Sequence, residues 1–89
     1  MANLYDVQIS KPAAKEISNL PGDVVNRILP HIAALANEPR PSGCKKLRGS
    51  ADLYRIRVGD YRILYTVDDK GKVVIVQAVR HRKEAYREN

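Results

Sequence analysis

Arginine side chains recur in the part of this chain that alternates as β-strands do. The segments 53–58 and 61–67 alternate apolar and polar residues, and the Gly-Asp dipeptide between them predicts a two-residue hairpin. In that register Arg57 lies directly opposite Arg62. Like charges opposed across a ladder destabilise a sheet. A polyanionic ligand would give this arrangement a reason outside folding.

The same alternation adds further arginines to this face of the predicted sheet. Arg55 and Arg80 join Arg57 and Arg62, and Arg82 joins them if the last strand continues. Guanidinium groups bind phosphate oxygens in a bidentate manner, so several on a rigid surface suit a phosphodiester better than a small acid. The alternative is that single arginines pair with carboxylates or cover apolar surface with their stems. That alternative explains the opposed pair less well than it explains isolated arginines.

Cleavage of an RNA backbone would require two proton transfers and a cation. The 2′-hydroxyl must lose a proton, the phosphorane must be stabilised, and the departing 5′-oxygen must gain a proton. Arginines can stabilise the charge, which is usually the largest effect, but they do not exchange protons readily at neutral pH. The proton transfers fall to His81, Lys83, Tyr86 or substrate groups. His81 points away from Arg80 by parity, which favours a structural role, and Tyr86 could stack on a base instead.

Other kinds of chemistry find little support in the sequence. One cysteine and two separated histidines give no metal-ligand spacing, so we expect no metal and no cofactor. There is no glycine-rich phosphate loop and no serine-nucleophile elbow. No run approaches the length of a membrane span, and the N-terminus lacks a signal-peptide pattern. With Cys44 alone, we expect a cytoplasmic protein and no membrane partner.

The charge of the chain is concentrated in its second half. The net charge is +6, yet residues 1–43 carry four basic and four acidic side chains, so residues 44–89 hold the whole excess. A one-sided basic field favours nucleic acid or another acidic partner. A solvated basic surface is the alternative, because such surfaces are common in small proteins.

The elements that position these residues can be predicted from apolar periodicity. A strand over 4–9 is followed by a helix that starts at Ser10 or Lys11. A second helix carries an apolar stripe from Val24 to Leu35. Pro30 interrupts its pattern, and we expect a kink rather than a break because the stripe resumes in phase.

The last hairpin is predicted to turn through a three-residue loop, Asp69 to Gly71, with Gly71 in the left-handed conformation. That register sets Tyr65 opposite Ile75 and Arg62 opposite Ala78. Four residues then share the arginine face: Val74, Val76, Ala78 and Arg80. A groove is expected at the small Ala78, between Arg62 and Arg80.

The order of elements predicts one α+β domain over residues 1–89. A strand, two helices and three further strands (β-α-α-β-β-β) make a two-layer fold, with a mainly antiparallel sheet and the helices on one face.

Four segments resemble the RelE branch of the RelE/ParE toxins. They are residues 46–49, 54–57, 59–65 and 79–86, and the resemblance covers nearly the whole chain. It implies a RelE-like, microbial RNase-type fold. It also implies a type II toxin that inhibits translation by cleaving messenger RNA in the A site of the 70S ribosome, without a metal. A cognate RelB-like antitoxin, small and acidic or partly disordered, would neutralise it.

The resemblance also assigns roles by position. Arg62 and Arg80 match the family's phosphate-stabilising arginines, and Tyr86 matches its C-terminal tyrosine, which stacks on or helps activate the substrate. Relatives often carry lysines where Arg55 and Arg57 stand, and only some carry a histidine at the position of His81. A lysine can transfer a proton where an arginine cannot.

A basic region that touches 16S ribosomal RNA in the family matches the segment 45–48. We therefore expect two sets of site residues. The catalytic set is Arg57, Arg62, Arg80, His81 and Tyr86. The set that binds RNA or the ribosome is Lys45, Lys46, Arg48, Arg55, Arg82 and Lys83.

Three functions remain open at this point. The first is a ribosome-dependent endoribonuclease, and the second is a ParE-like inhibitor of DNA gyrase, which the same scaffold supports. The third is a non-catalytic basic module that binds nucleic acid. The combination of Arg62, Arg80 and a terminal Tyr86 favours RNA cleavage.

Overall fold

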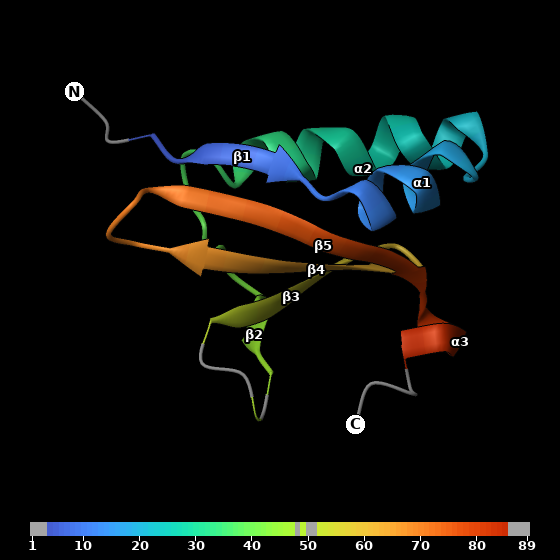
Figure 1. Ribbon diagram of the computed structural model, residues 1–89. Coiled ribbons are helices and arrows are strands. Elements are labelled where there is room, and N and C mark those ends of the chain that lie inside the picture. Colours follow the sequence, from blue (N-terminus) through green and yellow to red (C-terminus); the bar gives the residue numbers. More distant parts are fainter. Residues whose placement is uncertain (1–3, 48, 50–51, 86–89) are drawn as a thin grey trace.

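Two helices pack on one side of a five-stranded sheet (Figure 1). The computed structural model describes residues 4–47, 49 and 52–85 of the chain. Its elements are β1 (Asp6–Ile9), α1 (Lys11–Ser18), α2 (Gly22–Ala34), β2 (Lys45–Lys46), β3 (Leu53–Val58), β4 (Tyr61–Asp68), β5 (Val73–His81) and α3 (Arg82–Ala85). The strand order is β1-β5-β4-β3-β2, with β1 parallel to β5 and the other pairs antiparallel. The predicted two-layer α+β fold is confirmed.

The predicted start of the first helix is confirmed, whereas the predicted start of the first strand is wrong by two residues. The strand begins at Asp6 rather than Leu4, because the amide of Tyr5 donates to the carbonyl of Ala36 at 2.9 Å and not to the sheet. The helix starts as expected, since the Oγ of Ser10 accepts a hydrogen bond from the amide of Ala13 at 3.2 Å.

The second helix passes through its internal proline. α2 continues from Gly22 to Ala34 with Pro30 inside it, so the expectation that the helix would not break is confirmed. Ile28 and Ile32 of this helix are buried on the sheet. Within the part of the chain that the structure describes, no helix is long and apolar enough to cross a membrane.

The first hairpin forms in the predicted register. Tyr54 pairs with Tyr65, Arg57 with Arg62 and Val58 with Tyr61. Gly59 occupies the turn with a φ of +60°, a conformation that glycine adopts without a steric penalty.

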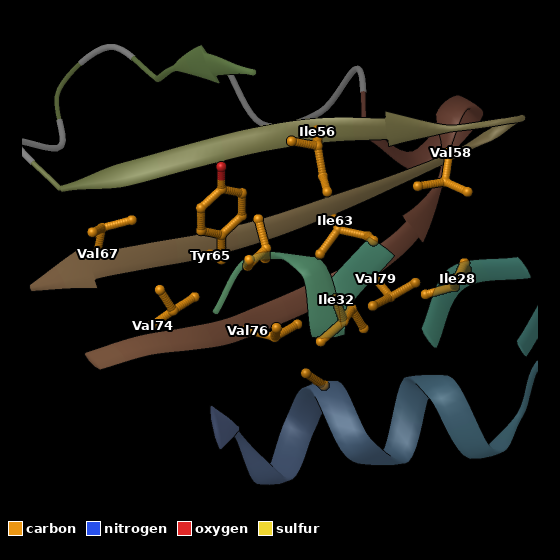
Figure 2. Close-up of a cluster of buried hydrophobic side chains, with 12 residues drawn as sticks. Ile28, Ile32, Ile56, Val58, Ile63, Tyr65, Val67, Val74, Val76 and Val79 are labelled. Carbon is orange, nitrogen blue, oxygen red and sulfur yellow. The ribbon is translucent and has the colours of Figure 1, made fainter. Parts of the chain in front are cut away.

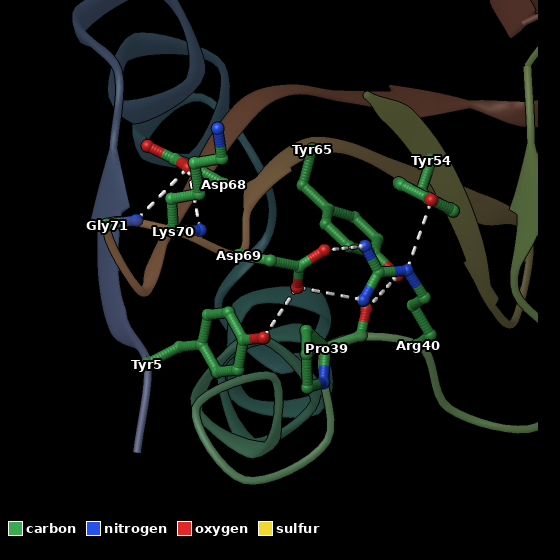
Figure 3. A network of polar contacts seen from close by, with 9 residues as sticks. All are labelled: Tyr5, Pro39, Arg40, Tyr54, Tyr65, Asp68, Asp69, Lys70 and Gly71. Atoms are coloured by element: carbon green, nitrogen blue, oxygen red, sulfur yellow. Dashed lines mark hydrogen bonds and ion pairs between the residues drawn. The ribbon is translucent and has the colours of Figure 1, made fainter. Parts of the chain in front are cut away.

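The turn of the last hairpin is longer than predicted. Asp68 pairs with Val73, so residues 69–72 form a four-residue loop, and Lys72 rather than Gly71 has a positive φ, of 57°. The Asp68 carboxylate accepts hydrogen bonds from the amides of Lys70 and Gly71, both at 3.1 Å, and thereby holds the loop (Figure 3).

A β-bulge at Gln77 corrects the rest of the predicted register. Tyr65 pairs with Val76, not Ile75, and Leu64 pairs with Ala78, which leaves Gln77 as the extra residue on β5. Because one extra residue reverses the alternation, Val74 and Val76 face the core and are fully buried, contrary to the prediction.

C-terminal to the bulge, the residues of β5 lie on the predicted faces of the sheet but pair with other residues of β4 than predicted. Ala78 and Arg80 lie on the arginine face as expected. Arg62, however, lies opposite Arg80 itself and not opposite Ala78, so the expected groove between Arg62 and Arg80 at Ala78 is also wrong.

The core lies between the sheet and the two helices. Figure 2 shows Ile28 and Ile32 of α2 together with Ile63 and Val76 from the strands, and Ile28, Ile63 and Val76 have no exposed surface. Burying each such side chain contributes about 1.5–3 kcal/mol. Tyr65 is buried among them and its hydroxyl donates to the carbonyl of Pro39 at 2.7 Å. Burial raises the pKa of the Tyr65 hydroxyl.

Candidate functional site

Three arginines form a row across three adjacent strands of the sheet. Arg57 on β3 pairs with Arg62 on β4, and Arg62 pairs with Arg80 on β5. Neighbouring strands lie about 4.8 Å apart, so the backbone positions of the three residues lie within roughly 10 Å of one another. We call these three residues the arginine row. The row carries like charges across two successive ladders, an arrangement that disfavours folding.

The central arginine of the row is the most buried. Arg62 is 8% exposed, whereas Arg57 is exposed and Arg80 is intermediate. A buried cation is costly unless it is hydrogen-bonded or paired. Arg62 is thus the least solvated of the three charges in the row.

A small pocket opens at the hairpin end of the row. It has a volume of about 100 Å³ and is lined by Arg57, Gly59, Asp60, Tyr61, Arg62 and Arg82. Pockets for drug-sized ligands are typically about 300–1,000 Å³. This pocket therefore suits one phosphate group and not a whole nucleotide, and its three arginines outweigh its single carboxylate.

The row next to the arginines is mostly apolar. Arg55, Leu64 and Ala78 are paired across β3, β4 and β5, and Leu64 and Ala78 are only 6% and 5% exposed. The arginine row is thus bordered by a packed apolar strip, which lowers the local dielectric and strengthens charge interactions there.

Arg80 has an acidic neighbour on α1. Its Nε lies 3.6 Å from Oε2 of Glu16, and the two side chains are 43% and 35% exposed. The other carboxylate oxygen of Glu16 accepts a hydrogen bond from the backbone amide of Val79 at 2.9 Å. Sequence reasoning missed Glu16, because its place beside β5 depends on how α1 packs.

Arg82 reaches the pocket from a helix and not from a strand. β5 ends at His81, so Arg82 begins α3 and does not extend the strand. The backbone amide of Arg82 donates to the carbonyl of Asp60 at 2.7 Å, and its Nε lies 4.0 Å from the Asp60 carboxylate. Sequence reasoning treated Asp60 only as a turn residue. The structure shows that it also anchors α3 to the hairpin, as the chain turns away from α1 and α2 (Figure 1).

His81 lies on the opposite face from the arginine row, as its parity predicts. It pairs with Tyr61, and the two rings meet edge to face with centroids 5.3 Å apart. The Nδ1 of His81 accepts a hydrogen bond from the amide of Lys83 at 3.3 Å. The side chain of Lys83 is exposed, and Lys83 directly follows the pocket-lining Arg82 in α3.

The basic segment before β3 divides between the two faces. Lys45 pairs with Arg55 and so lies on the arginine face, whereas Lys46 pairs with Tyr54 and lies on the helix face. Both lysines are exposed. Arg48 and Tyr86 lie outside the described residues. Among the described residues, no three His, Cys, Asp or Glu side chains are placed to hold a metal ion.

A polar network anchors the loop that leads from α2 into β2 (Figure 3). Arg40 makes a two-pronged contact with Asp69, at 3.1 and 2.8 Å, and its Nε donates to the hydroxyl of Tyr54 at 3.1 Å. Tyr5 donates to the same carboxylate at 2.6 Å. The hydrogen bond from Arg40, followed by that from Tyr5, lowers the pKa of Asp69 to about 2.

Comparison with known proteins places this chain among toxins. The family model described as "ParE toxin of type II toxin-antitoxin system, parDE" matches residues 7–86. Toxin RelE of Mycobacterium tuberculosis is 32% identical over 87 residues, which cover 96% of this chain and 89% of that protein.

Solved structures of similar sequence have the same fold. A chain of the archaeal RelE–RelB complex from Pyrococcus horikoshii OT3 superimposes with a TM-score of 0.79 at 37% identity, covering 89% of this chain and 96% of that chain. A chain of the intact E. coli RelBE toxin–antitoxin complex gives a TM-score of 0.76 at 30% identity, covering 86% and 95%.

Proposed function

Because the chain belongs to the RelE/ParE superfamily of type II toxins and is a RelE-type toxin, we propose that it is a ribosome-dependent endoribonuclease that cleaves messenger RNA in the A site. Residues 1–89 would act as one toxin domain in the cytoplasm, and cleavage would stop translation. The observation that carries the proposal is the arginine row, Arg57-Arg62-Arg80, beside a pocket of phosphate size.

The row suits the charge that develops when an RNA backbone breaks. The 2′-oxygen attacks phosphorus, the bond from phosphorus to the 5′-oxygen breaks, and a 2′,3′-cyclic phosphate and a 5′-hydroxyl result. Negative charge grows on the non-bridging oxygens between these events. Arg62 and Arg80, directly opposed on neighbouring strands, would flank those oxygens with preorganised donors. Arg57, which lies on β3, would neutralise either the phosphate that is cleaved or the phosphate next to it.

The proton transfers are assigned by position and chemistry. We propose Tyr86 and Lys83, which follow the pocket-lining Arg82 toward the C-terminal end of the chain. His81 stays a weaker candidate, because its ring packs on Tyr61 on the other face of the sheet. The 2′-hydroxyl loses one proton and the 5′-oxygen gains one, so no net proton is consumed.

The remaining basic residues would hold the ribosome and the RNA strand. Lys45, Lys46 and Arg48 would contact 16S ribosomal RNA, and Arg55, Arg82 and Lys83 would contact the message near the cleaved bond. A small acidic antitoxin, RelB-like, would cover this basic surface, as supported by the antitoxin chains in the complexes of similar toxins.

Gyrase inhibition is the second candidate, favoured by one finding. The family model that matches residues 7–86 is the one described as ParE toxin. The RelE toxins of similar sequence and the arginine row support messenger RNA cleavage instead.

The deciding experiment separates the two targets. The toxin is induced in cells, messenger RNA is mapped by primer extension, and purified toxin is added to a gyrase supercoiling assay. Cuts phased with codons support the nuclease, and blocked supercoiling without such cuts supports the gyrase inhibitor. Growth arrest without either result would contradict both.

Variants of the row test the site itself. We expect Arg62→Ala and Arg80→Ala each to lower ribosome-dependent cleavage by about 10²-fold or more, because each removes a donor to the transition-state oxygens. Circular dichroism should show the fold retained. Full cleavage by both folded variants would reject the site assignment.

A further inference from the structure

Glu16 contacts β5 at two neighbouring residues, Val79 and Arg80. β1 pairs with β5 only as far as Ile9 and Val76, so no strand of the described residues lies along the outer edge of β5 beyond Val76. There the backbone amide of Val79 donates to Oε1 of Glu16 at 2.9 Å. The second oxygen of the same carboxylate lies 3.6 Å from Nε of Arg80.

The helix α1 brings the carboxylate to this edge. Its capped first turn follows β1 directly, so the helix runs beside β5 and Glu16 faces the amide that β1 leaves uncovered. A charge-assisted hydrogen bond to a backbone amide is short and directional. Oε1 is therefore fixed by the sheet, and Oε2 is held at a defined place beside Arg80.

The contact selects which donors of Arg80 remain available. A guanidinium has five N–H donors, one on Nε and four on the two terminal nitrogens. Glu16 engages the Nε side, which leaves the terminal fork to bind a phosphate oxygen pair. An unrestrained arginine at 43% side-chain exposure would sample many rotamers and present its fork less often.

We propose that Glu16 is a positioning residue for Arg80, holding its guanidinium at the β5 end of the arginine row so that the terminal fork faces the phosphate. The inference rests on the proposed function. It adds an acidic residue, from a helix outside the basic face, to the parts that the cleavage site needs.

The variant Glu16→Gln isolates this role. Glutamine retains the length and an oxygen for the amide of Val79, but its NH₂ group carries no negative charge to pair with Nε of Arg80. We expect kcat for ribosome-dependent cleavage to fall by roughly tenfold, an effect of the size seen for coupled neighbours, with KM little changed and the thermal midpoint retained. A purely electrostatic role gives the opposite sign, because removing a negative charge beside a phosphate site would increase cleavage.

A double-mutant cycle with Arg80→Ala separates positioning from general structure. If Glu16 acts through Arg80, Glu16→Gln causes no further loss once Arg80 is absent. An equal loss of cleavage in the wild type and in Arg80→Ala would overturn the inference. So would a gain of cleavage when Glu16→Gln is made in the wild type, where Arg80 is present. Glu38→Gln is the matched control, since it removes the same charge from an exposed residue of the loop after α2, and it should leave cleavage unchanged.

A measurement without RNA keeps the test independent of the nuclease proposal. In ¹⁵N NMR spectra of the wild-type toxin, the Nε–H of Arg80 should exchange more slowly with water than that of exposed Arg57, and Glu16→Gln should abolish the difference. Equal exchange at both arginines in the wild type rejects the inference even if the toxin cleaves messenger RNA. Slow exchange with no cleavage by the wild type rejects the nuclease and retains the Glu16–Arg80 contact. The wild-type comparison needs no variant to fold.

Discussion

At the scale of single residues, the arginine row places like charges side by side, which costs stability but concentrates positive charge at the proposed site. Arg57 and Arg62 are directly opposed on β3 and β4, and Arg62 faces Arg80 on its other side. Like charges directly opposite one another destabilise a ladder. Under the proposed function the row would stabilise a doubly charged phosphorane, and the bound RNA would supply the opposite charge that offsets this cost. Stability and activity should therefore respond in opposite directions when the row is neutralised.

Arg57→Gln tests this trade-off. Glutamine retains much of the stem and removes the charge, so we expect the free energy of unfolding to rise by up to about 0.5 kcal/mol at low salt. The gain should shrink at high salt, because the repulsion is screened. Ribosome-dependent cleavage should fall at the same time. Lys70→Gln, in the exposed turn of the last hairpin, is the control for loss of one positive charge. A destabilised Arg57→Gln protein at low salt would contradict the opposition argument.

At the scale of the elements, loops and edges bring the basic residues together. The Gln77 bulge sets Arg80 opposite Arg62, and the Gly59-Asp60 turn holds the start of α3 through Arg82. The Arg40–Asp69 contact ties the loop after α2 to the turn between β4 and β5. That loop leads directly into β2, so the network helps to place Lys45 at the edge of the sheet.

The network predicts an acid-dependent loss of stability. The pKa of Asp69 is lowered from 3.8 to about 2 in the folded protein, mainly by the hydrogen bond from Arg40. Its stabilising effect is therefore complete above about pH 4 and disappears as the pH falls through 2. The variant Asp69→Asn should be less stable than the wild type at neutral pH, and the two should converge near pH 2. Urea unfolding at several pH values measures this. A constant difference from pH 6 to pH 2 would exclude the Asp69 contribution, and Glu38→Gln serves as the control.

The β2 strand predicts unequal roles for its two lysines. Lys45 shares the arginine face with Arg55, and Lys46 lies on the other face. We expect Lys45→Ala to weaken toxin binding to the ribosome more than Lys46→Ala does, and to reduce the dependence of affinity on salt by about one released ion. Sedimentation with 70S ribosomes at a series of salt concentrations measures both effects. Equal losses for the two variants would show that the faces are not distinguished.

At the scale of the whole molecule, the two halves of the chain differ both in the elements they supply and in their net charge. The first half supplies β1 and the two large helices and is neutral, and the second half supplies the remaining strands, α3 and the entire net charge of +6. Lys45, Arg55 and the arginine row lie on the sheet face away from the helices, whereas Lys46 lies on the helix face. An acidic antitoxin would be drawn to the basic half of the chain, which speeds encounter and orients the partner.

Association with the antitoxin should depend on this division. We expect the association rate to fall by about tenfold or more between low and high salt, because steering by opposite charges is screened. Lys83→Glu, in the basic half, should slow association more than Lys11→Glu at the start of α1, although both exchange one exposed charge. Stopped-flow mixing of purified toxin and antitoxin measures the rates. Equal slowing by the two variants would reject steering by the basic half.

The residues that act locally could be predicted from the sequence alone. The cap at Ser10, the turn at Gly59 and the register from Tyr54 to Val58 depend on neighbours a few residues away, and each formed as expected. The basic half and the arginine face are also consequences of composition and alternation. The sequence thus determined that a cationic sheet face exists and which strands carry it.

Only the tertiary structure decided that Arg80 lies opposite Arg62. A single extra residue, Gln77, reverses the alternation along β5, and no local pattern announces where a bulge will form. The placement of Glu16 beside Arg80 likewise depends on β1 ending at Ile9 and on α1 packing against the edge of β5 that this leaves open. Both features depend on contacts between residues far apart in the sequence. They follow from how the whole core packs and not from the local conformational preferences of Gln77 or Glu16.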